Sequence, residues 1–96
     1  MNILVAYDVN TTDKRGRRRL RRIAEACKDY GQRVQYSVFE LSVDLTRWTE
    51  LKIRLLTEMD DKKDSLRFYF LSSDDVRKTE HHGLNEPRDL SEPMIV

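Results

Sequence analysis

Residues 33–43 read RVQYSVFELSV, a β-rich stretch near the middle of the chain whose pattern sets the number of strands. Apolar side chains occupy every second position up to Val38, and the alternation then changes phase at Phe39. A change of one position means either a β-bulge within one strand or a tight connection between two strands. Because no Gly, Asn or Pro marks a turn there, one bulged strand and two strands both remain open.

A helical pattern flanks this stretch on each side. Residues 15–30 carry apolar side chains at helical spacing, and Gly31 suits the end of that helix. On the other side, Asp44 is placed to cap a helix over about residues 45–60. The apolar stripe expected on this second helix consists of Leu45, Trp48, Leu51, Leu55 and Met59.

Apolar, β-prone segments lie further out at residues 2–9 and 65–71, and a short one ends the chain at 94–96. The order predicts an α+β fold, a ferredoxin-like βαββαβ arrangement with an extra C-terminal strand. Both helices would cover one face of an antiparallel sheet, and the other face would stay open. Since that open face is apolar, we expect a homodimer packed through the sheets.

The length of 96 residues predicts a single ferredoxin-like domain, with a core over about residues 1–73 and an acidic tail over 74–96. No apolar run approaches the roughly 18 residues of a membrane helix, so we expect no membrane partner. The lone cysteine, Cys27, and the lack of a signal-peptide pattern favour a reducing, cytoplasmic location. These features exclude a disulfide-rich secreted scaffold and a multidomain enzyme.

The net charge of +1 hides an asymmetry along the chain. Residues 1–73 hold 15 basic and 11 acidic residues, whereas residues 74–96 hold 3 basic and 6 acidic ones. Seven cations fall within nine positions of the first helix: Lys14, Arg15, Arg17, Arg18, Arg19, Arg21 and Arg22. Cations at a helix N-terminus are unfavourable without an anion, which a nucleic-acid backbone would supply. The alternative is a merely solubilising surface.

Asp8 closes an otherwise apolar strand, and a carboxylate beside buried surface needs a partner. One interpretation is structural, as a cap or a salt bridge with Arg17 or Arg19. The other uses dimer symmetry: two Asp8 carboxylates that face each other across a two-fold axis repel, and a divalent cation between them removes the repulsion. Mg²⁺ suits such a site, and it polarises phosphoryl oxygens and acidifies bound water.

Several stretches together resemble the Cas-two family of small CRISPR-associated proteins of spacer acquisition. They are Tyr7-Asp8 at the strand end, the arginine-rich first helix, Gly31 followed by VQYSVFE at 34–40, and DSLRFY at 64–69. The resemblance covers nearly the whole chain. It implies a ferredoxin-like homodimer that acts as a metal-dependent endonuclease on double-stranded DNA or single-stranded RNA. The alternative that it implies is a non-catalytic, duplex-binding adaptor that bridges subunits of a CRISPR integrase.

The resemblance places catalysis and the metal, Mg²⁺ or another divalent cation such as Mn²⁺, at Asp8. Arg17 lies in the first helical turn after the Asp8 loop, so we expect it to contact phosphate near the metal, followed by Arg19. The other expected nucleic-acid contacts are the outward-facing Arg18 and Arg22, and Arg33. Tyr7, Ser37 and Phe39 are expected to support the site. The acidic tail is the candidate surface for docking the integrase.

Overall fold

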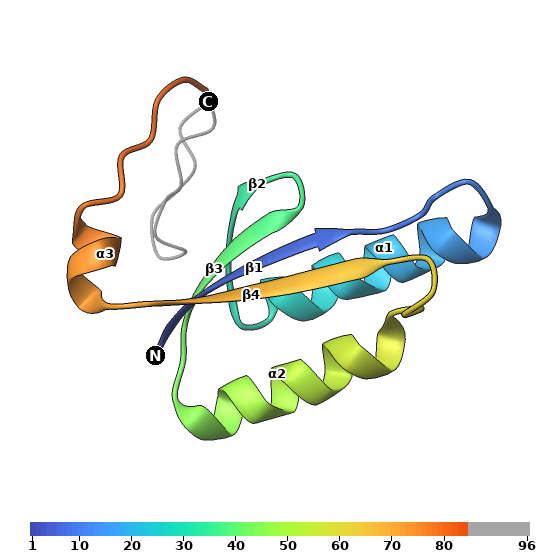
Figure 1. The fold of residues 1–96 in the computed structure, drawn as a ribbon, viewed down its shortest axis with the longest axis horizontal. Coiled ribbons are helices and arrows are strands. Elements are labelled where there is room, and N and C mark those ends of the chain that lie inside the picture. Colours follow the sequence, from blue (N-terminus) through green and yellow to red (C-terminus); the bar gives the residue numbers. More distant parts are fainter. Residues whose placement is uncertain (85–96) are drawn as a thin grey trace.

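Four strands form one antiparallel sheet in the order β2-β3-β1-β4 (Figure 1). The computed structural model describes residues 1–84. Its elements are β1 (Asn2–Asp8), α1 (Lys14–Lys28), β2 (Gly31–Gln35), β3 (Val38–Ser42), α2 (Leu45–Glu58), β4 (Ser65–Leu71) and α3 (Ser73–Arg77). The predicted α+β class and ferredoxin-like order are confirmed. The strand expected at 94–96 and most of the acidic tail lie outside the described residues.

The central β-rich stretch forms two strands. β2 and β3 pair with each other and are joined at Tyr36 and Ser37, and the register shifts between Arg33 and Gln35. The Tyr7 N–H donates to the Ser37 carbonyl at 3.0 Å, which ties the connection to β1. The change of phase in the sequence therefore marks a tight turn, and a local irregularity in β2 accompanies it.

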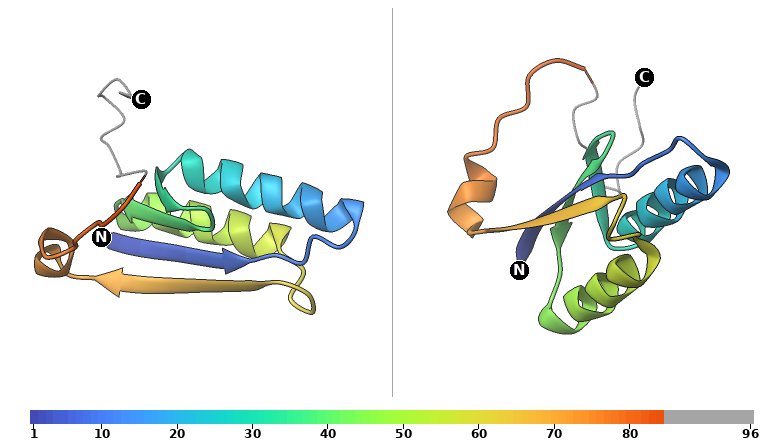
Figure 2. Two further views of the ribbon diagram at one scale, coloured as in Figure 1. Left: turned by 90° about the horizontal axis from the view of Figure 1, so that it is seen from above. Right: turned by 45° about the vertical axis from the view of Figure 1, so that its right-hand side comes forward.

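Both long helices cover the same face of the sheet (Figure 2). Side chains of β1 alternate between that face and the open one, so Ile3, Val5 and Tyr7 are buried beneath the helices, whereas Asp8 is exposed. On α2, Trp48 packs edge-on against Phe68 of β4, with ring centroids 4.8 Å apart. The helix-covered face is thus the core, and Asp8 lies on the face that no helix covers in the described part of the chain.

Two expectations about the helices are wrong. Leu45 does not belong to the apolar stripe of α2, because it is the first helical residue and its side chain is 67% exposed. Gly31 does not end α1, which stops at Lys28; it begins β2. A Cβ at Gly31 would collide with the Leu41 side chain and the Glu40 carbonyl, so close strand packing requires this glycine.

The segment after β4, where the expected acidic tail starts, begins with the short helix α3. Ser72 and Asp75 form a reciprocal capping box, in which each side chain accepts a hydrogen bond from the other residue's backbone N–H. The helix lies beyond the end of β4, close to the N-terminus (Figure 1). Within residues 1–84, no helix has both the length and the apolar character needed to cross a membrane.

Candidate functional site

Asp8 is the last residue of β1 and lies opposite Ser65 of β4. Its side chain points to the open face of the sheet, on the side away from both helices. Among residues 1–84, no side chain or backbone group forms a hydrogen bond or ion pair with this carboxylate. The salt bridge to Arg17 or Arg19, one of the two interpretations of this residue, is absent from that range, and the Asp8 carboxylate is exposed.

Tyr7 points to the opposite face and belongs to the core, as strand alternation predicts. Its ring stacks on the fully buried Phe39, with centroids 6.3 Å apart, and its hydroxyl donates to the Tyr36 carbonyl at 3.3 Å. Burial raises the pKa of Tyr7, and the nearby Arg33 guanidinium partly opposes that increase. Both aromatic residues are therefore core residues.

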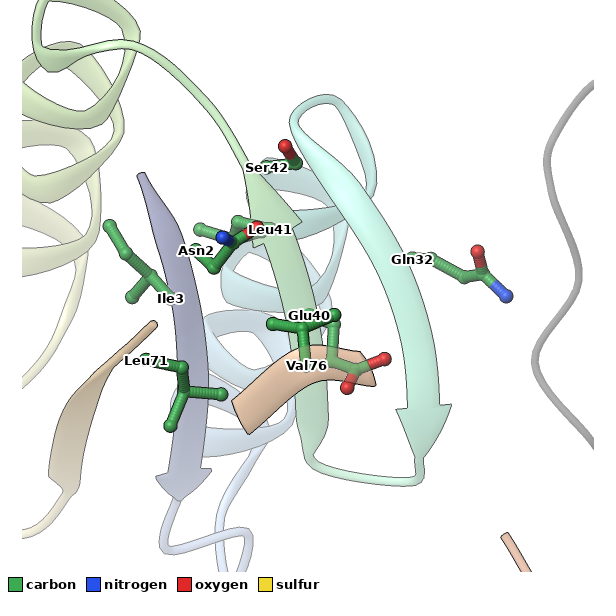
Figure 3. Close-up of a pocket in the computed structure, with 8 residues that line it drawn as sticks. All are labelled: Asn2, Ile3, Gln32, Glu40, Leu41, Ser42, Leu71 and Val76. Carbon is green, nitrogen blue, oxygen red and sulfur yellow. The ribbon is translucent and has the colours of Figure 1, made fainter. Parts of the chain in front are cut away.

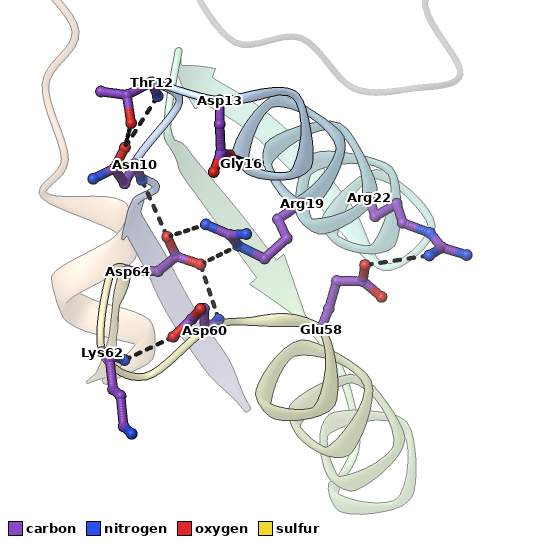
Figure 4. A network of polar contacts seen from close by, with 10 residues as sticks. All are labelled: Asn10, Thr12, Asp13, Gly16, Arg19, Arg22, Glu58, Asp60, Lys62 and Asp64. Atoms are coloured by element: carbon purple, nitrogen blue, oxygen red, sulfur yellow. Dashed lines mark hydrogen bonds and ion pairs between the residues drawn. The ribbon is translucent and has the colours of Figure 1, made fainter.

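The buried carboxylate at this end of the sheet is Asp64, to which the sequence assigned no role. Its side chain is 0% exposed, and it accepts hydrogen bonds from Arg19 and from the backbone N–H groups of Asn10 and Asp60 (Figure 4). Burial alone would raise the pKa of Asp64, but the Arg19 guanidinium and the two backbone donors outweigh it and hold that pKa below its usual value.

Arg19 belongs to this network. Its side chain is only 14% exposed, and its Nε lies 2.8 Å from Oδ2 of Asp64. The hydrogen bond to Asp64 raises the pKa of Arg19. Arg19 precedes the buried Ile23 by one helical turn, and this spacing turns it toward the sheet. In this structure the Arg19 side chain is therefore engaged by Asp64, and its contact with phosphate stays a prediction.

The remaining predicted arginines stay at the surface in different surroundings. Arg17 is exposed, and its Nη1 donates weakly to the Thr11 carbonyl at 3.4 Å, in the loop that follows Asp8. Arg18 is exposed. Arg22 is exposed too, but its Nη1 lies 3.5 Å from Oε1 of Glu58 on α2, so the two side chains form an ion pair. Arg33 lies on β2 with its guanidinium 5.2 Å from the centre of the Phe39 ring, where it covers the core.

Two lysines extend the basic surface at the Asp8 end of the sheet. Lys62 and Lys63 are exposed in the turn between α2 and β4. The pKa of Asp13 is lowered mainly by its hydrogen bond from the Gly16 N–H, and the charge of Lys63 adds to this effect. In the sequence these lysines lie between aspartates at 60, 61 and 64, so this segment has no excess of positive charge that would indicate a basic surface.

A shallow pocket opens at the other end of the sheet (Figure 3). Its lining residues are Asn2, Ile3, Gln32, Glu40, Leu41, Ser42, Leu71 and Val76. None of the residues predicted for the site belongs to it. Within the described part of the chain, no group of three or more His, Cys, Asp or Glu side chains is arranged to hold a metal ion.

The family model for CRISPR associated protein Cas2 matches residues 1–79 of the chain. The chain belongs to the Cas2 family. A relative named CRISPR-associated endoribonuclease Cas2, from Chlorobaculum tepidum, is 58% identical over 96 residues and is matched along the whole of both chains. Another, named CRISPR-associated endonuclease Cas2, from Halalkalibacterium halodurans, is 48% identical over 95 residues and covers 99% of each chain.

Solved Cas2 structures share the fold. The crystal structure of Streptococcus pyogenes Cas2 at pH 6.5 is 51% identical to this chain, with a TM-score of 0.78, and covers 86% of this chain and 100% of its own. A hypothetical protein from Thermus thermophilus, 32% identical, superposes with a TM-score of 0.72 over 91% of this chain and 96% of its own. Family membership and fold are thereby established together.

Proposed function

We propose that this Cas2 protein is a metal-dependent endonuclease that acts as a homodimer. The observation that supports this most directly is Asp8, an exposed carboxylate without a partner among residues 1–84, at the end of an apolar strand on the uncovered sheet face. The names of the relatives, endoribonuclease and endonuclease, support cleavage of phosphodiester bonds. RNA and double-stranded DNA are both candidate substrates, because a phosphate-binding surface accepts either.

The donor set fits Mg²⁺ or Mn²⁺. Mg²⁺ binds through one or two carboxylates and keeps several waters, so a single Asp8 from each subunit is enough protein for such a site. The exposure of Asp8 leaves room for those waters. When bound, the ion would polarise a phosphoryl oxygen and lower the pKa of a bound water. Asp8 itself contributes the negative charge that holds the ion.

The open sheet face supplies the dimer surface. Leu4 and Ala6 of β1 lie on that face, flanked by Val38 of β3 and by Tyr69 and Leu71 of β4. Tyr69 is 42% exposed and the other four are partly buried. A second copy packed against this face would bury it, and a two-fold axis close to the Asp8 end would bring the two carboxylates together.

The basic surface of α1 supplies the nucleic-acid contacts. Arg17 and Arg18 are exposed in its first turns, close to the loop that follows Asp8. Arginine binds phosphate through two parallel hydrogen bonds, which positions a backbone as well as attracting it. Lys62 and Lys63 add charge at the same end of the sheet.

Replacement of one carboxylate tests the proposal. In Asp8→Asn, we expect Mg²⁺-dependent cleavage of single-stranded RNA and duplex DNA to be lost, because the neutral amide no longer attracts the cation. Nucleic-acid binding stays nearly unchanged, since the basic surface is intact. Asp61→Asn, a change of the same chemistry at an exposed position, keeps full activity. Cleavage that persists in rigorously purified Asp8→Asn protein excludes the nuclease.

The second candidate is a non-catalytic adaptor that binds duplex DNA and bridges subunits of a CRISPR integrase. The observation that favours it is that the cationic surface of α1 does not depend on Asp8, so binding needs no chemistry. Under this proposal, Asp8→Asn supports spacer acquisition as well as the parent does. Removal of the acidic tail, 74–96, abolishes co-purification with the integrase, and retained association excludes the tail as the docking surface.

A further inference from the structure

Asp64 has more hydrogen-bond donors around it than a capping residue needs. Oδ1 accepts from the Asn10 N–H at 3.1 Å and from Arg19 Nη2 at 3.3 Å. Oδ2 accepts from Arg19 Nε at 2.8 Å and from the Asp60 N–H at 2.9 Å. Four donors fill the acceptor sites of the carboxylate, and three separate parts of the chain supply them.

This network adjoins Asp8 through the backbone on two sides. Asn10 follows Asp8 by two residues, and Ser65, which pairs with Asp8 across the sheet, follows Asp64 directly. Asp64 therefore anchors both the chain that leaves Asp8 and the strand that pairs with it. Because side chains alternate along a strand, the Asp64 carboxylate lies on the helix side while Asp8 lies on the open side.

Further contacts hold the loop between β1 and α1. The Asn10 side-chain oxygen accepts from the Thr12 N–H at 3.0 Å and from the Thr12 hydroxyl at 2.7 Å. At Gly16, a Cβ would collide with the Asn10 carbonyl, so α1 touches the loop backbone directly. The position of Asn10 thus depends on Asp64 on one side and on α1 on the other.

We propose that the Asp64–Arg19 ion pair is a positioning device for the candidate catalytic carboxylate Asp8. The inference rests on the proposed nuclease function. Arg19 contributes by holding Asp64 rather than by touching phosphate. Loss of the pair releases Asn10 and the start of β4, and the Asp8 carboxylate loses its fixed place at the strand end. The cleavage rate falls while the affinity for nucleic acid stays the same, because a small displacement of a catalytic group reduces the rate steeply.

The first test separates kcat from binding. In Asp64→Asn, we expect kcat for Mg²⁺-dependent cleavage to fall at least about tenfold. The Kd for nucleic acid, measured without divalent metal so that no cleavage occurs, changes less than about twofold. Arg19→Lys keeps the positive charge but loses the planar guanidinium that binds both Asp64 oxygens, so kcat falls less than in Asp64→Asn. Asp61→Asn, at an exposed position outside the network, behaves as the parent. If Arg19→Lys weakens nucleic-acid binding instead of lowering kcat, Arg19 is a phosphate contact and the proposal is wrong.

The second test needs no activity. Amide hydrogen exchange in Arg19→Lys and Asp64→Asn is expected to quicken at least about tenfold at Asn10 and at the paired ends of β1 and β4, but not in the β2–β3 hairpin. Uniform quickening would make the pair a general stabiliser and would overturn the proposal. If the parent itself fails to cleave, the nuclease proposal fails, and this exchange pattern still decides whether the pair holds Asp8.

Discussion

Two aspartates meet at one end of the sheet with opposite surroundings. Asp8 ends β1 on the open face, whereas Asp64 precedes β4 on the helix side and is bound by Arg19 (Figure 4). The rule that a carboxylate beside buried surface needs a partner was applied to Asp8 and holds for Asp64. Sequence alone could not separate the two, because both lie at strand ends and only the sheet register shows which one faces the helices.

The depressed pKa of Asp64 predicts an acid-sensitive contribution to stability. The folded state holds the proton less tightly than the unfolded chain, so this contribution is fully present above the usual aspartate pKa of about 3.9 and is lost as pH falls through the lower folded value. Urea unfolding of the parent and Asp64→Asn between pH 2 and 7 measures it, and we expect the stability gap to narrow below about pH 4. A gap that stays constant with pH contradicts this account.

At the scale of elements, α1 has one face that packs in the core and one face that carries positive charge. Its inner face buries Ile23, Ala26 and Cys27, and its outer face presents cations. Burial raises the pKa of the Cys27 thiol to about 12, so Cys27 acts as a core residue. The periodicity of the helix predicted this division correctly. The same periodicity puts Arg19 on the row of Ile23, but only the structure shows that the partner of this inner cation is the buried Asp64.

Gly16 gives a test of the contact between α1 and the loop after Asp8. In an exposed helix, Gly→Ala usually stabilises by about 0.5–1 kcal/mol. Here the added Cβ meets the Asn10 carbonyl, so we expect Gly16→Ala to destabilise by about 1–3 kcal/mol instead. Thermal unfolding then shows a melting temperature lower by several degrees, with Arg21→Ala on the same helix as control. A rise in melting temperature would falsify the close approach.

The outer face of α1 is tested by the salt dependence of binding. Arg17→Ala combined with Arg18→Ala removes two proposed phosphate contacts. The slope of log affinity against log salt is negative, and its magnitude should therefore decrease by about 2 for duplex DNA of any sequence. Arg77→Ala, on α3 beyond the other end of the sheet, serves as the control (Figure 1). A slope equal to that of the parent in the double variant means that α1 does not track the backbone.

The β2–β3 turn shows where local sequence signals end. Hairpin turns usually carry Gly or Asn, and this one is made by Tyr36 and Ser37. Its place is held by long-range contacts: Tyr7 donates from its N–H to Ser37 and from its hydroxyl to Tyr36. Because tertiary contacts specify this turn, its one mark in the sequence is the change of phase in the apolar alternation. One bulged strand and two strands therefore could not be distinguished from the sequence.

At the scale of the whole molecule, element order was enough to predict the ferredoxin-like fold and the placement of both long helices on one face of the sheet. Within residues 1–84, no helix covers the other side of the sheet, which carries partly buried apolar side chains on its central strands. This uncovered face explains why the proposed activity needs a second copy. A single Asp8 carboxylate would bind a divalent cation weakly. Under the proposal, a two-fold axis supplies a second carboxylate without any further residue in the chain.

The arrangement of the two Asp8 carboxylates in the assembled protein tests the central proposal most directly. The measurement is a crystal structure of the protein grown with Mn²⁺, with the ion located by its anomalous scattering. We predict a dimer packed through the open sheet faces and an anomalous peak bound by Asp8 from both subunits. A dimer that places these side chains on remote surfaces, or a protein that is monomeric in solution, would contradict the account and leave only the cationic surface of α1.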